Sequence, residues 1–371
     1  MTAGTRIKAA VLREPGKPLT IEELVLAPPG PGEVEVRIAA SGICHSDISY
    51  FNGAWLGAMP AVYGHEGAGV VVAVGEDVNG VTPGQRALIT LVRACGTCFF
   101  CGHEQPALCE TSFPRDATSP LTTLDGEPVL HGFHTAAFAE RVVVHESQVV
   151  PIPDDLPFDC ASLLSCGVLT GYGAVTKTSG VEAGASVVVI GAGGVGLNSI
   201  QAAALTGAAP VIAVELDPAK LEVTRSFGAT HALNPHDDDV LASVLALTGG
   251  RGADYVFVTV GSVTAMESGM SLVRRGGDLV VVGMTPAGTT ANFDPTALAH
   301  DAVKLVGSKM GSSVPLVDVP ALAELYTEGR LKLDELISAR YPLEQINEAV
   351  ASTASGSALR NVIVFDIDTG A

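Results

Sequence analysis

Four closely spaced cysteines provide the ligands for a metal ion. The segment reads CGTCFFCGHEQPALC, and its cysteines are Cys95, Cys98, Cys101 and Cys109. Four thiolates brought together by glycine-containing turns form a closed tetrahedral site, which suits Zn²⁺ best. Disulfide pairing and an iron–sulfur cluster are the alternatives, although the odd total of seven cysteines disfavours the first and the lack of a proline after the run disfavours the second. A closed site does no chemistry, so metal-dependent catalysis requires a second, open site elsewhere in the chain.

Two other cysteines and one histidine could form that open site. Cys44 lies in GICHSD, His65 in GHEG and Cys166 in SCGVLTGYGA. Two sulfurs and one imidazole, with a fourth position left for water or substrate, are a catalytic zinc set. Their separation along the chain does not prove a site, because a buried cysteine also serves as a small apolar residue. Cys160 is predicted to be such a residue.

A glycine-rich run predicts a dinucleotide site. GAGGVG, residues 191–196, follows the apolar segment SVVVI and opens a segment rich in alanine and leucine. The first glycine permits a tight turn, the second lets the backbone approach a pyrophosphate, and the third lets helix and strand pack closely. The pyrophosphate would then lie at the helix N-terminus, where free N–H groups favour negative charge. The predicted residues of this turn are Gly191, Gly193, Gly194, Val195 and Gly196.

An acidic residue after the next apolar segment indicates which dinucleotide is used. Glu215 ends VIAVE, where a carboxylate accepts hydrogen bonds from the adenosine ribose and repels a 2′-phosphate. NAD is therefore predicted rather than NADP. Lys220 either flanks the adenine or is simply solvated.

The patterns along the chain predict two domains. Up to residue 150, short β-branched or alternating segments such as VEVRIAASG and GAGVVVAVG are separated by glycine and proline, which indicates strands. From about residue 160, apolar strands alternate with helical segments, which indicates βαβ units and a parallel sheet. The 371 residues are enough for two domains.

Charge and hydropathy exclude several classes of partner. The formal net charge of −19 repels phosphates, which argues against a nucleic acid or an anionic membrane. There is no run of about 18 apolar residues and no apolar core in the N-terminal segment, so we expect a cytoplasmic protein without a transmembrane helix or signal peptide.

The ordered set of motifs resembles the zinc-dependent medium-chain alcohol dehydrogenases over almost the whole chain. The set comprises GICHSD, GHEG, the four-cysteine lobe, SCGVLTGYGA and GAGGVG, and it is closest to the class that includes glutathione-dependent formaldehyde dehydrogenases. The resemblance implies an α/β fold with a GroES-like β-barrel catalytic domain and a doubly wound Rossmann cofactor domain. The implied parts are residues 1–167 with the lobe at 95–109, the Rossmann domain at 168–309, and a return segment at 310–371.

The same resemblance implies two zinc ions per chain, NAD, and a homodimer or homotetramer. Cys44, His65 and Cys166 would hold the catalytic zinc, and the lobe cysteines the structural zinc. Asp47 would accept a hydrogen bond from the His65 ring and fix its tautomer. The other implied roles are Glu66 close behind the metal, Ser46 in proton release, His45 near phosphate or exposed, Thr170 and Val282 beside the nicotinamide, and Arg360 on the pyrophosphate.

Departures from the family pattern bear on the substrate. Ser49, a weak base, stands where many members have the histidine that ends the proton relay, so the final acceptor stays open between His45 and water. Residues 52–57 lack the acids of the formaldehyde-adduct class, and Arg115 is displaced from that class's arginine position. Leu91 and Gly132 replace bulky residues, which predicts a wider apolar pocket.

We therefore expect an NAD-dependent zinc dehydrogenase that interconverts an aromatic or medium-chain primary alcohol and its aldehyde. In this chemistry zinc activates a hydroxyl group and the nicotinamide accepts hydride. A dehydrogenase for a thiol adduct of formaldehyde is the first alternative. A non-catalytic protein that binds zinc and NAD is the second.

Overall fold

The computed structural model describes residues 4–366 and divides the chain into two compact units. Unit 1 contains residues 1–166 together with 314–371, and unit 2 contains residues 167–313. The sequence places these boundaries at 167/168 and 309/310, so the second one lies later in the structure than predicted.

Contacts with the first helix of unit 2 explain the later boundary. Thr170 Oγ1 donates to Met310 Sδ at 3.6 Å, and Ser313 Oγ donates to the Leu169 carbonyl at 3.2 Å. Both segments lie in unit 2, so residues 310–313 complete its packing before the chain returns to unit 1.

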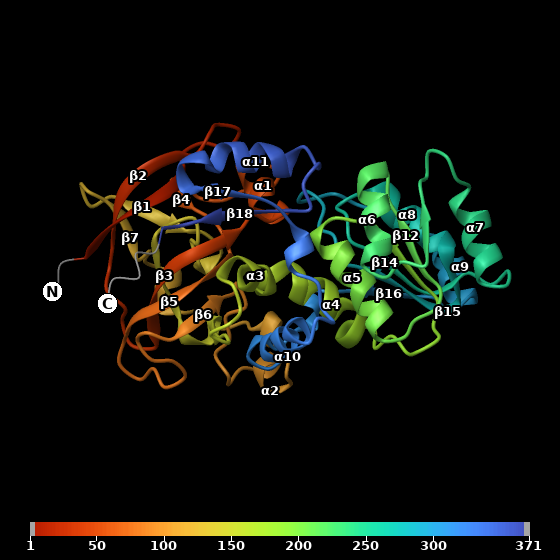
Figure 1. The fold of residues 1–371 in the computed structure, drawn as a ribbon, viewed down its shortest axis with the longest axis horizontal. Helices are drawn as coiled ribbons and strands as arrows, with labels where there is room; N and C mark the ends of the chain where they lie inside the picture. Colours follow the sequence, from red (N-terminus) through yellow and green to blue (C-terminus); the bar gives the residue numbers. More distant parts are fainter. Residues whose placement is uncertain (1–3, 367–371) are drawn as a thin grey trace. The chain divides into compact units, whose positions relative to one another are not determined.

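Unit 1 is built from a closed barrel and a mixed sheet (Figure 1). The barrel contains β1 (Thr5–Leu12), β2 (Thr20–Leu26), β7 (Leu121–Thr123), β8 (Pro128–His131) and β4 (Ala61–Val62), in that order. The sheet order is β10 (Val149–Pro151), β6 (Arg86–Ile89), β5 (Glu66–Val74), β3 (Glu33–Gly42), β18 (Arg360–Val364) and β17 (Ile337–Pro342), with β9 (Arg141–His145) paired to β3. Its helices are α1 (His45–Phe51), α2 (Phe99–Gly102), α3 (Phe158–Leu163), α10 (Pro315–Thr327) and α11 (Ile346–Ala354).

Alternating side chains explain why these segments form strands around a core. In β3, Val34, Val36 and Ile38 are buried in one apolar cluster together with Val142 of β9. Period-2 alternation places such residues on the same face of a strand. A second cluster, which includes Leu12, Leu24 and Phe138, fills the barrel side of the unit.

Unit 2 is a six-stranded parallel sheet with the strand order of a Rossmann fold. Its order is β13 (His231–Leu233), β12 (Val211–Val214), β11 (Val187–Ile190), β14 (Ala253–Val258), β15 (Val273–Val281) and β16 (Lys304–Gly307). Strands β11 and β12 are buried along their whole length, as expected for parallel strands covered on both faces. The helices are α4 (Leu169–Gly173), α5 (Gly194–Leu205), α6 (Pro218–Ser226), α7 (Val240–Leu247), α8 (Val263–Leu272) and α9 (Pro295–His300) (Figure 1).

One continuous helical segment is long and apolar enough to cross a membrane, by length and composition only. It spans Phe158–Thr178, and 83% of its apolar window is buried inside the structure. The sequence predicts no transmembrane helix, and the burial of this segment inside the protein is consistent with that prediction. Burial against the rest of the protein accounts for the apolar side chains, as in a core helix.

Candidate metal centre and cofactor site

Four residues from three distant parts of the sequence converge in a buried cluster. The ligand atoms of Cys44, His65, Glu66 and Cys166 all lie within 4.8 Å of one another, and all four residues are buried. Cys44 is the N-cap of α1, His65 directly precedes β5, and Cys166 lies in the π-helical turn Leu164–Val168. A π turn widens a helix locally and often occurs at functional sites.

Asp47 fixes the geometry of this cluster. Its buried carboxylate accepts hydrogen bonds from the backbone N–H of Cys44 at 2.9 Å and of Gly64 at 3.1 Å. The same carboxylate lies 3.3 Å from Nδ1 of His65, which directs the other ring nitrogen toward the two sulfurs. Nε2 of His65 is buried and has no hydrogen-bond partner. A buried polar atom without a partner is costly, so the cluster fits a metal ion at Nε2.

The electrostatics of the cluster also fit a cation. A hydrogen bond with Cys166 lowers the pKa of the Cys44 thiol well below its ordinary value and correspondingly raises the pKa of Cys166. Burial disfavours the charged form of His65, but Asp47 and Cys44 raise its pKa well above the ordinary value. Burial raises the pKa of Glu66 to about 7. A divalent ion displaces such protons when it binds thiolate and neutral imidazole.

We expect Asp47→Asn to weaken binding of the metal at this cluster by about 10- to 100-fold, because an amide no longer holds the imidazole as a carboxylate does. Competition with a zinc chelator of known affinity measures the change. Asp217→Asn is the matched control, since Asp217 also caps a helix, α6, in unit 2. Equal zinc affinities of the wild type and Asp47→Asn would show that Asp47 does not position the His65 ring for the metal.

Arg360 lies at this cluster, which the sequence did not predict. Its Nη2 lies 3.2 Å from Oε1 of Glu66, and its Nη1 donates to the Ile43 carbonyl at 3.1 Å. The strand pairing is the cause, because β18 runs beside the end of β3 with Val362 opposite Gly42. The guanidinium therefore balances the charge of the Glu66 carboxylate within unit 1. The implied role of Arg360 on a pyrophosphate stays a prediction.

The predicted proton-relay residues lie at the start of α1. Ser46 is half-buried and His45 is exposed. Ser49 does not replace the missing histidine base, because its Oγ donates to the His45 carbonyl at 3.1 Å.

Phe133, which the sequence did not indicate, lies against the metal cluster and packs with further aromatic residues. The Phe133 ring centroid lies 4.3 Å from that of His65, and Phe133 adopts a left-handed backbone with φ of 55°. Such a conformation is uncommon for a bulky residue and is held only by its surroundings. Tyr50 stacks on Tyr63 at 4.6 Å and meets Trp55 edge-on at 5.5 Å. No local sequence signal marks a left-handed phenylalanine.

Gly132 does not widen the pocket as the sequence predicted. A Cβ at this position would lie 2.6 Å from the Tyr63 ring and 2.6 Å from the Val62 carbonyl oxygen. The glycine therefore permits the close approach of Tyr63, and the aromatic ring fills the space. Phe113 contacts Arg93 and His145.

The four-cysteine lobe has the dimensions of a tetrahedral zinc site. The sulfur atoms of Cys95 and Cys101 are 4.0 Å apart, those of Cys98 and Cys109 are 3.9 Å apart, and all four lie within 4.8 Å of one another. Zinc–sulfur bonds of about 2.3 Å in a tetrahedron require sulfur–sulfur edges of about 3.8 Å. All cysteines of the described chain are free of disulfides, so that alternative is not formed.

The glycine-rich turn of unit 2 has the local geometry expected for a dinucleotide. Gly191 has a φ of 99°, and a Cβ at Gly196 would lie 1.8 Å from the Gly191 carbonyl oxygen. A Cβ at Gly193 would meet nothing within 4 Å, so this N-cap of α5 leaves open space beside the first N–H groups of the helix. Those features fit a pyrophosphate. Gly194 and Val195 form the first turn of α5.

The remaining predicted cofactor residues also lie in unit 2. Glu215 accepts a hydrogen bond from the Ala192 N–H at 2.7 Å, which holds its carboxylate beside the glycine-rich turn. Lys220 lies on α6 and is half-buried. Thr170 is buried on α4, and Val282 follows β15, where its N–H donates to the Val258 carbonyl at 3.0 Å.

Comparisons with known proteins agree with this fold. Residues 30–154 match the family described as "Alcohol dehydrogenase GroES-like domain", and residues 194–328 match "Zinc-binding dehydrogenase". An "Alcohol dehydrogenase class-3" of Cereibacter sphaeroides is 39% identical over 97% of this chain and 100% of its own length. An "S-(hydroxymethyl)glutathione dehydrogenase" of Paracoccus denitrificans is 36% identical over 97% of this chain and 100% of its own length. The crystal structure of benzyl alcohol dehydrogenase from Acinetobacter calcoaceticus superposes with a TM-score of 0.91 at 30% identity, over 98% of this chain and 100% of that chain.

The chain belongs to the zinc-dependent medium-chain alcohol dehydrogenase family. It is an oxidoreductase that acts on CH–OH groups, with zinc and NAD(P) as its cofactors. The predictions of family, fold class and enzyme class are thereby confirmed.

Proposed function

We propose that the enzyme interconverts a primary alcohol with an aromatic or medium-chain body and its aldehyde, using NAD. The aromatic side chains beside the metal cluster carry this proposal, above all Phe133 at 4.3 Å from His65. An aromatic substrate gains offset or edge-to-face contacts with such rings, whereas ethanol does not. The likeness to a benzyl alcohol dehydrogenase supports the same substrate class.

In this proposal, Cys44, His65 and Cys166 hold one zinc ion and leave one coordination position open. Zinc bound there supplies the Lewis acidity that lowers the pKa of a hydroxyl group, and bound nicotinamide supplies the hydride acceptor. Asp47 holds the His65 ring in position. Ser46 would relay the proton of the substrate hydroxyl, accepting it while its own hydroxyl proton passes on toward solvent.

The preference for NAD rests on Glu215. Its carboxylate lies at the glycine-rich turn, where it also accepts hydrogen bonds from the N–H groups of Leu216 at 2.8 Å and Asp217 at 3.0 Å. A carboxylate held in this way accepts hydrogen bonds from ribose hydroxyls and repels the 2′-phosphate of NADP. Gly191, Gly193 and Gly196 shape the turn for the pyrophosphate.

A thiol adduct of formaldehyde is the second candidate substrate. The similarity to an S-(hydroxymethyl)glutathione dehydrogenase favours it. Two features oppose it: residues 52–57 carry no acid, and Arg115 is already engaged by Glu33, with Nε–Oε1 and Nη2–Oε2 distances of 2.8 and 2.9 Å.

A substrate panel tests the proposal. We expect kcat/KM for benzyl alcohol or hexanol with NAD to exceed that for ethanol at least about 10-fold, and NADP to be at least about 100-fold poorer than NAD. Phe133→Ala should lower kcat/KM for benzyl alcohol about 3- to 10-fold while leaving hexanol less affected. Phe293→Ala, which truncates an exposed phenylalanine of unit 2, is the matched control.

Two outcomes would contradict the proposal. A higher kcat/KM for ethanol than for either larger alcohol would exclude the aromatic or medium-chain assignment. Formaldehyde oxidation that requires added glutathione, and that exceeds every free alcohol in kcat/KM, would favour the second candidate.

A further inference from the structure

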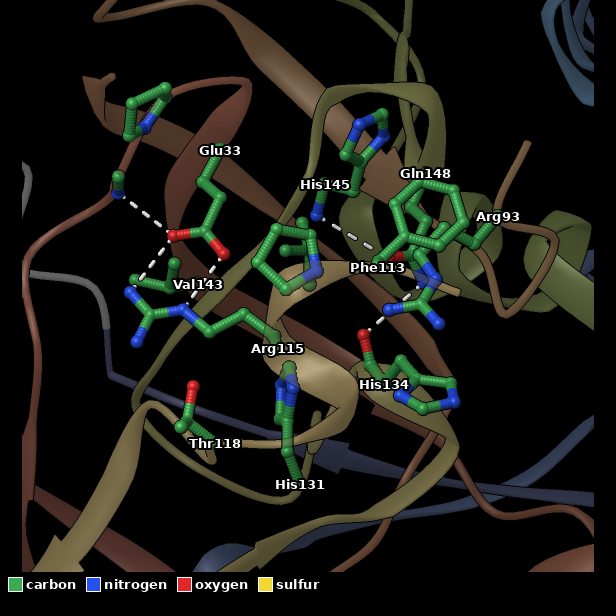
Figure 2. Close-up of a pocket in the computed structure, with 14 residues that line it drawn as sticks. Glu33, Arg93, Phe113, Arg115, Thr118, His131, His134, Val143, His145 and Gln148 are labelled. Atoms are coloured by element: carbon green, nitrogen blue, oxygen red, sulfur yellow. Dashed lines mark hydrogen bonds and ion pairs between the residues drawn. The ribbon is translucent and has the colours of Figure 1, made fainter. Parts of the chain in front are cut away.

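A cavity of about 340 Å³ in unit 1 shares no residue with the metal cluster. Figure 2 shows Arg93, Arg115 and the three histidines His131, His134 and His145 around it. Apolar side chains complete its wall, including Phe113, Pro31 and Val143. Cavities that bind small organic ligands have this size and this mixture of apolar walls with a few polar groups.

The two guanidinium groups are held in place and still present N–H groups to the cavity. Arg93 pairs with Asp116 and lies 4.0 Å above the Phe113 ring. Arg115 uses Nε and Nη2 to bind both oxygens of Glu33. The Nη1 group of each arginine has no hydrogen bond within the described chain, so donors suited to a carboxylate remain.

The three imidazoles in this cavity are neutral near pH 7. Burial lowers the pKa of His131 to about 3, and burial also lowers the pKa of His134 and His145. Arg93 adds to the effect on all three rings, because its charge repels a second positive charge. The positive groups at the cavity are therefore Arg93 and Arg115, each partly balanced by a carboxylate, and an anion would bind through their remaining N–H donors.

His131 supplies an independent sign that a ligand belongs here. Its exposed fraction is 7%, and its Nε2 is buried without a hydrogen-bond partner. In the neutral ring with its proton on Nδ1, Nε2 is an acceptor, and leaving a buried acceptor unpaired is costly.

The chemistry of the cavity excludes a metal and selects the ligand. Its histidines do not form a group with metal-ligand spacing among residues 4–366, and the arginines repel a cation. A ligand must bring a negative group for the guanidiniums, a hydrogen-bond donor for Nε2 of His131, and an apolar body for Phe113 and Val143.

We propose that this cavity binds a small hydroxycarboxylate with an apolar body. The carboxylate binds the free N–H groups of Arg93 and Arg115, and the hydroxyl donates to Nε2 of His131. The apolar body packs against Phe113 and Val143. The site is separate from the alcohol site, and it stands or falls independently of the substrate assignment above.

Two matched probes test this site on the full-length, zinc-loaded enzyme without added nucleotide, so that no turnover occurs. Calorimetry compares mandelate with phenylacetate, which lacks the hydroxyl. We expect mandelate to bind at least about 10-fold more tightly, because phenylacetate leaves Nε2 of His131 unpaired. A crystal of the enzyme with 4-bromomandelate should show the bromine anomalous signal inside the cavity.

Two variants check which groups bind. Arg93→Gln should raise the dissociation constant of mandelate at least about 10-fold, whereas Arg330→Gln, which removes the same charge at an exposed pair with Glu328, should not. His131→Phe should abolish the preference for mandelate over phenylacetate. Equal affinities of the two probes in the wild type, no binding of either, or bromine only at the Cys44 cluster would overturn the proposal.

Discussion

Replacing Cys44 with serine is expected to lower kcat/KM at least about 1000-fold, since a catalytic metal supplies several kcal/mol of transition-state stabilisation. Residues 4–366 contain two groups with metal-ligand spacing, and this variant disables one. A serine hydroxyl stays protonated where the Cys44 thiol has a strongly lowered pKa, so it is a far poorer zinc ligand. The two side chains are similar in size, so the surrounding fold should remain.

Zinc analysis and steady-state kinetics on the same preparation measure this effect. The zinc content should fall from two ions per chain to one, while the circular dichroism spectrum stays unchanged. Cys160→Ser is the matched control, because Cys160 is also a buried cysteine of unit 1 and belongs to neither metal group. Retention of both zinc ions and of turnover in Cys44→Ser would exclude the assignment of the catalytic site.

Features encoded within a short stretch of chain were predictable from the sequence. The lobe cysteines follow one another within two turns and a short helix, so their spacing alone indicates that their sulfurs meet. The glycine-rich turn is equally local, because Gly191 and Gly196 approach each other within one strand–turn–helix. Cys44, His65 and Cys166 needed the resemblance to a family, since three distant elements bring them together.

Features that depend on tertiary contacts could not be predicted in the same way. Arg360 reaches Glu66 only because β18 pairs with the end of β3, and a sequence does not show which strands pair. The left-handed backbone of Phe133 is imposed by its surroundings and carries no glycine or asparagine signal. The orphaned Nε2 of His131 likewise follows from burial, which depends on the complete fold.

Replacing Cys98 with serine is expected to remove the other zinc ion and to lower the melting temperature by about 5 to 15 °C, as a loss of a few kcal/mol would in a protein of this kind. The lobe has little else to hold it, because Ala107 is its only buried residue from 95 to 109 among those described, while Phe99 and Leu108 are exposed. Hydrogen bonds from the Thr111 hydroxyl and backbone N–H groups lower the pKa of Cys95 to about 5, which favours the thiolate that a metal requires.

Zinc content, thermal denaturation and limited proteolysis together test the predicted effect of Cys98→Ser. In contrast to Cys44→Ser, the kcat/KM of freshly purified Cys98→Ser at low temperature should remain within about 10-fold of the wild type, because a structural zinc contributes to folding and not to the chemical step. New protease cleavage sites should appear between residues 93 and 120, where the chain loses its crosslink. A Cys98→Ser protein that keeps two zinc ions, or that melts at the wild-type temperature, would show that the four sulfurs do not hold a structural metal.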